Sequence, residues 1–176
     1  MKNIFVIVGS SGSGKTAIGK KAFGASNELV SHTTRKKRPN EKNGIDYHFV
    51  SKNEMYELIK TNQLVEHSIY NGELYGISKK EIEAKTQKSD TFFVTDKNGL
   101  KAITELYPDN TISVFIDVPK KILNDRLIKR KEPNITERLN LFEEEQKLKK
   151  LTRYTIKNID FRQAVRSMIT LATKHR

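Results

Sequence analysis

The 176-residue sequence contains no cysteine. This absence excludes disulfide bonds, thiolate nucleophiles and zinc sites built from thiolates, and it is compatible with a reducing cytosol. Long hydrophobic runs are missing too. The apolar segment at residues 4–8 is too short for the core of a signal peptide, and no later segment approaches the length of a membrane span. At this length, these absences favour one soluble cytoplasmic domain with small insertions.

Acidic residues are in the minority: 21 Asp and Glu stand against 33 Lys and Arg, which gives a net charge of +12. Such an excess favours polyanionic partners, namely nucleotides, phosphosugars, nucleic acid or an anionic membrane surface, without choosing among them. Part of the excess is lysine in helical segments that also carry glutamate, such as "FEEEQKLKK" at residues 142–150. That pattern is typical of a solvated helix face.

Strand and helix patterns alternate along most of the chain. The continuous apolar, mostly β-branched run at residues 4–8 predicts a strand buried on both faces, and further strands are expected at residues 91–95 and 111–116. Helices are expected at residues 15–23, 97–107, 119–130, 135–150 and 161–173. This alternation predicts an α/β fold, with a parallel sheet flanked by helices.

Two stretches interrupt the alternation. Residues 33–85 contain turn signals, short strand-like pieces and one helical pattern at residues 52–60, and we expect them to form a small inserted lobe. The polar segment at residues 129–138 contains Pro133 and separates two basic helices. We expect this segment to be a mobile lid.

The sequence "GSSGSGKT" at residues 9–16 matches the phosphate-binding pattern G-x-x-x-x-G-K-[ST] in full, directly after a buried strand and at the start of a helix. Its glycines let backbone N–H groups turn inward, and the helix amino terminus adds partial positive charge. The lysine should reach the β- and γ-phosphates, and the threonine hydroxyl should hold Mg²⁺. The residues expected to bind the triphosphate are Gly9, Ser10, Ser11, Gly12, Ser13, Gly14, Lys15 and Thr16.

A carboxylate that organises this metal is expected at the end of a neighbouring strand. Asp96, which ends "TFFVTD", is the first candidate, and Asp117, which ends "VFID", is the second. An aspartate at such a position is also a common helix cap, so both interpretations stay open for each residue.

A second anion site is indicated by the run Arg35 to Arg38, in which two arginines bracket two lysines. A guanidinium forms forked hydrogen bonds with phosphate oxygens. Tyr47 and Tyr75 add phenolic donors near turns, and Glu66 places a carboxylate on an otherwise apolar strand-like run. The alternative interpretation of the charge run is a solvated surface loop.

These segments resemble the guanylate kinase family. The resemblance is carried by the glycine-rich loop, then "SHTTRKKRP", "NGIDYHFVS" and "QLVEHSIYNGELYGIS", and a strand that ends in Asp before "NG"; it runs from residue 4 to about residue 165. It implies transfer of the γ-phosphoryl group of ATP, with Mg²⁺, to GMP or dGMP, which gives ADP and GDP. The implied division is a P-loop core (1–32, 86–125 and 151–176), a GMP-binding lobe (33–85), and a lid with its following helix (126–150).

The resemblance also implies roles for individual residues. The GMP phosphate would be clamped by Arg35, Arg38, Tyr47 and Tyr75. The guanine base would be read by Ser31 and Glu66, with Asp96 near both base and metal. Catalysis would rest on Lys15, Arg126, Arg130 and Arg138 along the transferring phosphates. Independently, Arg126 and Arg130 lie four apart on an expected helix and share a face, where they can neutralise developing charge or be surface decoration.

Three features depart from the family pattern. Ile77 follows the glycine of "LYGIS", where the family places a hydroxyl that donates to guanine. Loss of one buried polar partner costs roughly 1–3 kcal/mol, unless Ser78 takes its place. Val94 replaces the first carboxylate of the family's strand end, and the lid between Arg130 and Arg138 is short.

Other functions remain open at this point. A kinase of the same fold with another phosphorylated acceptor, such as ribose 1,5-bisphosphate, is the first alternative, and Ile77 favours it while Arg38 and Glu66 oppose it. A non-catalytic binding module of the same fold is the second, and the intact phosphate-binding loop opposes it. Nucleic-acid binding comes last, because no recognition module is present. We expect nucleotides as partners, no nucleic acid or membrane, and a monomer or homodimer.

Overall fold

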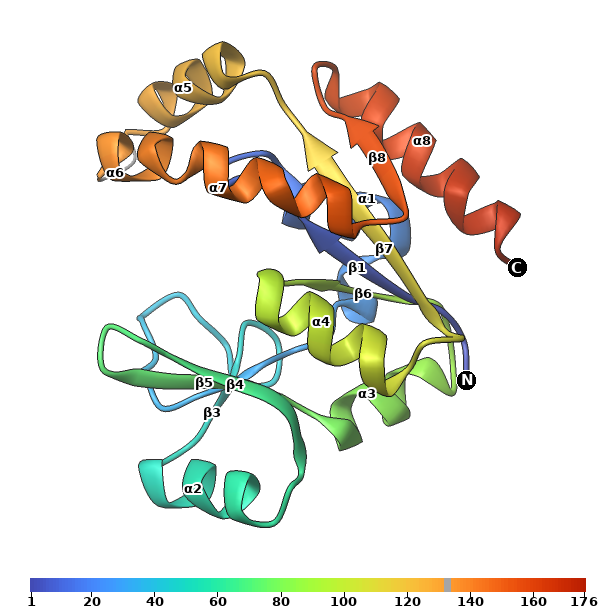
Figure 1. The fold of residues 1–176 in the computed structure, drawn as a ribbon. Helices are drawn as coiled ribbons and strands as arrows, with labels where there is room; N and C mark the ends of the chain where they lie inside the picture. Colours follow the sequence, from blue (N-terminus) through green and yellow to red (C-terminus); the bar gives the residue numbers. More distant parts are fainter. Residues whose placement is uncertain (132–133) are drawn as a thin grey trace.

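The centre of the molecule is a four-stranded parallel sheet with strand order β6-β1-β7-β8 (Figure 1). The structure is a computed structural model and describes residues 1–131 and 134–176. In sheet order, the strands are β6 (Thr91–Val94), β1 (Ile4–Val8), β7 (Thr111–Asp117) and β8 (Tyr154–Lys157). The predicted α/β class with a parallel sheet is confirmed. Because the strands are parallel, their carboxyl ends meet at one edge of the sheet.

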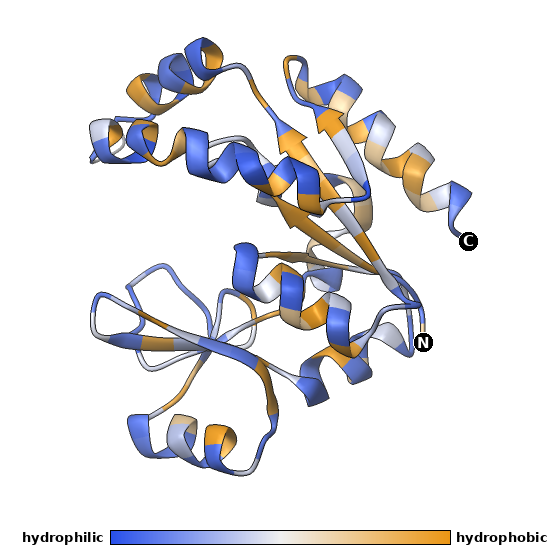
Figure 2. Cartoon of the chain, viewed as in Figure 1, coloured by the Kyte–Doolittle hydropathy of each residue, from blue (hydrophilic) through white to orange (hydrophobic). Residues whose placement is uncertain are grey.

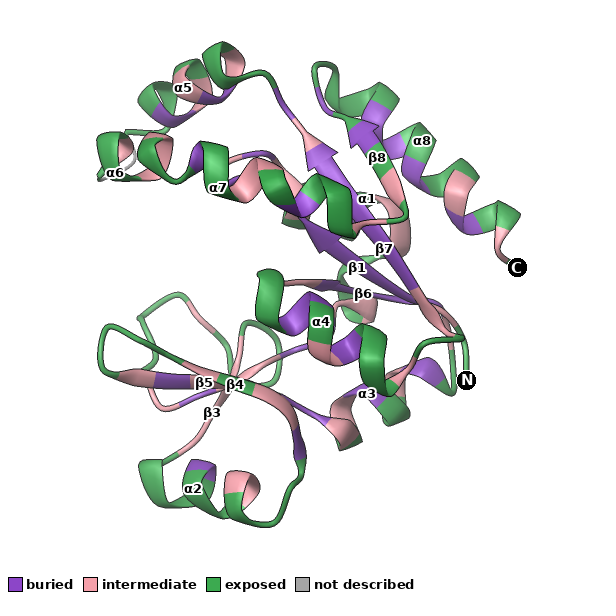
Figure 3. Ribbon diagram, viewed as in Figure 1, coloured by how far each residue is buried: buried purple, intermediate pink, exposed green. Residues whose placement is uncertain are grey.

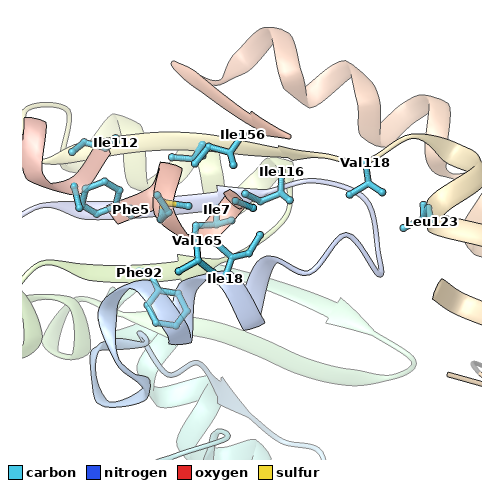
Figure 4. Packing of buried hydrophobic residues seen from close by; sticks show 14 of the residues in the cluster. Phe5, Ile7, Ile18, Phe92, Ile112, Ile116, Val118, Leu123, Ile156 and Val165 are labelled. Carbon is cyan, nitrogen blue, oxygen red and sulfur yellow. The ribbon is translucent and has the colours of Figure 1, made fainter. Parts of the chain in front are cut away.

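Strand β1 is fully buried and supplies side chains to both faces of this sheet, as its apolar run predicts. Phe5 and Ile7 belong to one hydrophobic cluster, shown in Figure 4, and Ile4, Val6 and Val8 belong to the other. The first cluster includes residues of α1 (Lys15–Phe23), α5 (Lys120–Lys129) and α8 (Phe161–Lys174). The second includes residues of α3 (Lys79–Thr86), α4 (Lys97–Leu106) and the 3-10 helix η2 (Lys147–Leu151). Figure 2 shows the apolar strands between more polar helices.

A second, mixed sheet has strand order β3-β2-β5-β4. Its strands are β2 (His32–Thr33), β3 (His48–Phe49), β4 (Leu64–Tyr70) and β5 (Glu73–Ser78). The short 3-10 helix η1 (Ala25–Asn27) precedes β2, and helix α2 (Lys52–Lys60) lies between β3 and β4. The buried core of this sheet and α2 consists of Met55, Leu64 and Leu74. Most of this region is exposed or half-buried (Figure 3).

Glu81 on α3 connects the two sheets. Its carboxylate accepts a hydrogen bond from the Val30 amide at 3.0 Å and lies 3.2 Å from Nε2 of His48, on β3. Lys85 pairs with the same carboxylate at 2.9 Å. Although burial alone would raise it, hydrogen bonds from His48, Val30 and Lys85 lower the pKa of Glu81 to about 2. Glu81 is therefore a charged anchor between β3 and the segment that leaves the central sheet.

The single helix predicted at residues 135–150 is wrong. The chain forms α6 (Ile135–Asn140), α7 (Phe142–Gln146) and η2 in its place. Phe142 belongs to the first hydrophobic cluster and Leu148 to the second, so this segment has to cross the carboxyl edge of the sheet. Pro133, which the sequence places in the lid, lies outside the described residues.

Strand β8 and helix α3 are among the elements that were not predicted. Strand β8 has only one buried residue, Ile156, and helix α3 follows β5 without a break, so neither has a strong hydrophobic period of its own. In the part of the chain that the structure describes, no helix has the length and apolar character needed to cross a bilayer.

Candidate active site

The phosphate-binding loop joins the end of β1 to the start of α1, as the motif predicts. Gly12 and Gly14 have φ values of 85° and 91°, in the left-handed region that favours glycine. A Cβ atom at Gly12 would lie 2.8 Å from Cδ2 of Leu127, and one at Gly14 would lie 2.6 Å from Nδ2 of Asn158. Conformation and space therefore both require glycine at these two positions.

Lys15 is folded back over the loop. Its Nζ donates to the carbonyl oxygens of Gly9 at 2.6 Å and Ser10 at 3.0 Å. Burial lowers the pKa of Lys15 to about 8; Glu145 opposes this shift, and Arg138 adds to it. A lysine in this place, beside the amino terminus of α1, suits phosphate oxygens rather than a surface role.

The lid arginines lie around the same loop. Arg138 on α6 donates from Nη1 to Oγ of Ser11, and Arg126 on α5 donates from Nη2 to the Asn158 carbonyl at 2.8 Å. Burial and the nearby Arg130 lower the pKa of Arg126. A cavity of about 500 Å³ opens beside the loop, lined by Gly12, Gly14, Ala17, Arg126, Lys129, Arg130, Asn158 and Phe161. This cavity joins the loop to two of the three predicted arginines.

The second anion site is assembled around Glu41. Arg35 forms an ion pair with Glu41 at 2.7 Å, and its guanidinium lies 5.4 Å from the ring centre of Tyr47. The Tyr47 ring lies 5.8 Å from that of Tyr75, edge on. Arg38 is exposed, and its backbone amide donates to Glu41 at 2.9 Å. The four predicted clamp residues are thus brought together in one place.

Glu66 and Asp96 come from different sheets and influence each other. Burial and the charge of Asp96 raise the pKa of Glu66 to about 7. Asp96 follows β6 and caps α4, because its Oδ1 accepts from the amides of Asn98 at 2.9 Å and Gly99 at 3.1 Å. A half-buried carboxylate with a raised pKa needs hydrogen-bond donors from a partner, which makes Glu66 a candidate binding group.

One cavity links the two anion sites. It has a volume of about 180 Å³ and is lined by Thr16 of the phosphate-binding loop together with Ser31 and Tyr47 of the second region. The other lining residues are Glu28, Leu29, Val30, Ile45, Asp46, Phe93 and Val94. The residues expected at the triphosphate and at the acceptor therefore face a common space.

Two predicted candidates have other partners. The Ser78 hydroxyl caps α3 by accepting from the Glu81 amide at 3.2 Å, and Ser78 is buried. Ile77 lies in the second hydrophobic cluster, and side chains alternate along a strand, so Ser78 points away from the Ile77 side of β5. Asp117 is ion-paired with Lys149 at 2.8 Å. Ser78 thus caps a helix and Asp117 forms an ion pair, and both are contacts that stabilise the fold.

The donor atoms fit Mg²⁺ bound together with a nucleotide. Within residues 1–131 and 134–176, no group of three or more His, Cys, Asp or Glu is arranged to hold a metal by itself. Mg²⁺ in phosphoryl transfer usually takes one or two protein oxygens, with phosphate and water completing six. The exposed Thr16 hydroxyl and the exposed Asp96 carboxylate are oxygen donors of this kind.

Three residues at the site were not assigned a role from the sequence. Glu41 holds Arg35, Glu145 contacts the phosphate-binding loop, and the buried Asn158 donates from Nδ2 to the Ser13 carbonyl at 2.7 Å. Glu41 lies between the segments "SHTTRKKRP" and "NGIDYHFVS", close in sequence to the arginine that it holds. Glu145 and Asn158 carry no local signal, because only the fold brings them to the loop.

The fold and the two linked anion sites define a P-loop kinase with a separate acceptor region. The guanylate kinase family model matches residues 1–173. The guanylate kinase of Coxiella burnetii is 33% identical over 99% of this chain and 88% of its own length, and that of Legionella pneumophila is 31% identical over 99% and 87%. The crystal structure of guanylate kinase from Anaplasma phagocytophilum has a TM-score of 0.73 and 28% identity, over 98% of this chain and 85% of that one. The chain belongs to the guanylate kinase family.

Proposed function

We propose that this chain transfers the γ-phosphoryl group of ATP to GMP or dGMP, giving ADP and GDP, with residues 33–85 as the acceptor lobe and residues 126–150 as the lid. The observation that carries the assignment of sites is the cavity shared by Thr16, Ser31 and Tyr47. An acceptor phosphate held in the lobe would there face the end of a triphosphate held by the loop. In-line transfer requires this geometry.

On the donor side, the loop amides and Lys15 bind the β- and γ-phosphates. Arg126, Arg130 and Arg138 come from the lid and compensate the charge that spreads over the transferring group. Bound Mg²⁺ would be held by Thr16 and Asp96 and would supply charge neutralisation at the phosphates. A lid without cationic side chains could not offset this charge. In this proposal the three arginines are the part of the lid that acts in the reaction.

On the acceptor side, Arg35, Arg38, Tyr47 and Tyr75 hold the GMP phosphate. Glu66 accepts hydrogen bonds from the N1–H and the exocyclic amine of guanine, and Ser31 adds a contact to the base. A phosphate oxygen of GMP is itself an adequate nucleophile, so the reaction requires positioning and charge stabilisation and no general base. Asp96 completes the site beside Glu66.

Two departures from the family limit this site. Ile77 is buried in the hydrophobic core and offers no hydrogen bond to guanine, so base recognition rests mainly on Glu66. The end of β6 carries Val94 in place of a carboxylate, which leaves Asp96 as the acidic group that would hold Mg²⁺. We infer action in the cytoplasm, as a monomer or homodimer, on free nucleotides.

A coupled assay of ADP release tests the proposal. ATP and Mg²⁺ are offered with GMP, dGMP, AMP, UMP or ribose 1,5-bisphosphate in separate reactions. We expect turnover with GMP and dGMP, and values of kcat/KM at least about tenfold lower with AMP and UMP. Turnover with the sugar bisphosphate alone would contradict the assignment of the acceptor.

A further inference from the structure

Helix α7 carries three consecutive glutamates whose surroundings differ. Glu143 and Glu144 are exposed and pair with lysines, Lys120 at 3.6 Å and Lys147 at 2.5 Å. Glu145 is half-buried, and its Oε2 accepts from the Ser11 amide at 3.4 Å. One of three chemically identical side chains therefore turns away from solvent, toward the phosphate-binding loop.

The position of Glu145 on its segment is unusual for a carboxylate. Phe142 and Leu148 lie three residues before and after it, and both are buried. Between two buried apolar neighbours of the same segment, an apolar side chain would be expected. A carboxylate placed there loses hydration and needs donors in return. The Ser11 amide supplies one, and the charges of Lys15 and Arg138 add to it.

We propose that Glu145 is a positioning residue of the phosphate-binding loop: its carboxylate accepts from the Ser11 amide and holds this part of the loop in place before the triphosphate arrives. The inference rests on the proposed role of the loop in binding ATP. Lys15, on the same loop, donates to the carbonyl oxygens of Gly9 and Ser10. Glu145 reaches the loop only because its segment crosses the carboxyl edge of the sheet.

Two substitutions separate the hydrogen bond from the charge. Glu145→Gln keeps an oxygen that accepts from Ser11 but removes the charge, so we expect ATP affinity within about twofold of the parent. Glu145→Leu removes both the acceptor and the charge. We expect it to weaken ATP binding by roughly tenfold without lowering the melting temperature. Glu144→Gln, one residue away and exposed, is the matched control and should behave as the parent.

The dissociation constant for ATP is measured by titration calorimetry in the absence of acceptor, on the full chain. The KM for ATP and the KM for GMP are measured in parallel, and only the first should change. Parent-like ATP affinity in both Glu145 variants, or tighter binding by Glu145→Gln, would overturn the inference. Because the titration does not depend on turnover, a parent that binds ATP but does not phosphorylate GMP would contradict the proposed function alone.

Discussion

At the scale of single residues, Glu66 has the property that most directly predicts behaviour in solution. Burial and Asp96 raise its pKa to about 7. A raised carboxylate pKa means that the side chain gains a proton as the pH falls through 7, and a protonated Glu66 no longer accepts from two guanine donors. We therefore expect kcat/KM for GMP to fall toward acid pH, with an apparent pKa near 7 in a pH profile of the free enzyme.

The Glu66→Gln variant should lack this decrease in kcat/KM toward acid pH, and it should discriminate GMP from AMP roughly 10- to 100-fold less well than the parent. Asp96→Asn should move the decrease to lower pH, because it removes a negative charge that raises the pKa of Glu66. Glu57→Gln, an exposed position in the same lobe, is the control. An unchanged profile in Glu66→Gln would show that another group reads the base.

Residues that belong to a continuous motif could be predicted from the sequence. The loop from Gly9 to Thr16 is an example, since its spacing and residue types together indicate a phosphate-binding loop. Glu145 could not be found in this way, because its three-glutamate context also describes an exposed face. What distinguishes it is burial between Phe142 and Leu148, which depends on how the segment crosses the sheet.

At the scale of elements, helix α1 packs closely against strand β6 at Gly19. A Cβ atom at Gly19 would lie 2.4 Å from ring atoms of Phe92. Gly19→Ala gains about 1 kcal/mol in helix propensity, but the overlap forces the helix away from the sheet. We expect a net loss of about 1–3 kcal/mol in the free energy of unfolding, measured by urea denaturation. The double variant Gly19→Ala with Phe92→Leu should recover part of that loss, and a stabilised single variant would contradict the packing.

The elements that could be predicted are those with a clear hydrophobic period. The run at residues 4–8 has one, and β1 matches it residue for residue. Strand β8 is four residues long with a single buried side chain, so its place beside β7 is decided by tertiary packing. The break of the predicted helix at residue 141 carries no such signal either: Leu139 and Phe142, on its two sides, both pack in the first hydrophobic cluster, and the segment reaches the second cluster only at Leu148.

At the scale of the whole molecule, the two sheets differ in how much core they have. The central sheet is packed on both faces, whereas the second sheet and α2 share the buried residues Met55, Leu64 and Leu74. A region with so few buried apolar contacts opens more readily than the rest. We expect hydrogen exchange to be faster in β4 and β5 than in β1 and β7, as measured by mass spectrometry on peptides.

Addition of GMP should slow exchange in β4 and β5, since ligand binding stabilises the state that binds. AMP at the same concentration serves as the control and should give little protection. Equal exchange in both sheets without ligand would show that the second sheet draws its stability from contacts other than its own core.

The anchoring of Glu81 between the Val30 amide and His48 has a mechanical consequence. A lobe that swings as a unit turns about its firmest attachment, and the arc traced by each part grows with its distance from that axis. The tip of the β4–β5 hairpin projects far from α3 and sweeps the widest path (Figure 1). A fluorophore at Asn71 would report that sweep with the greatest amplitude, and the lack of native thiols makes one introduced cysteine a unique attachment point.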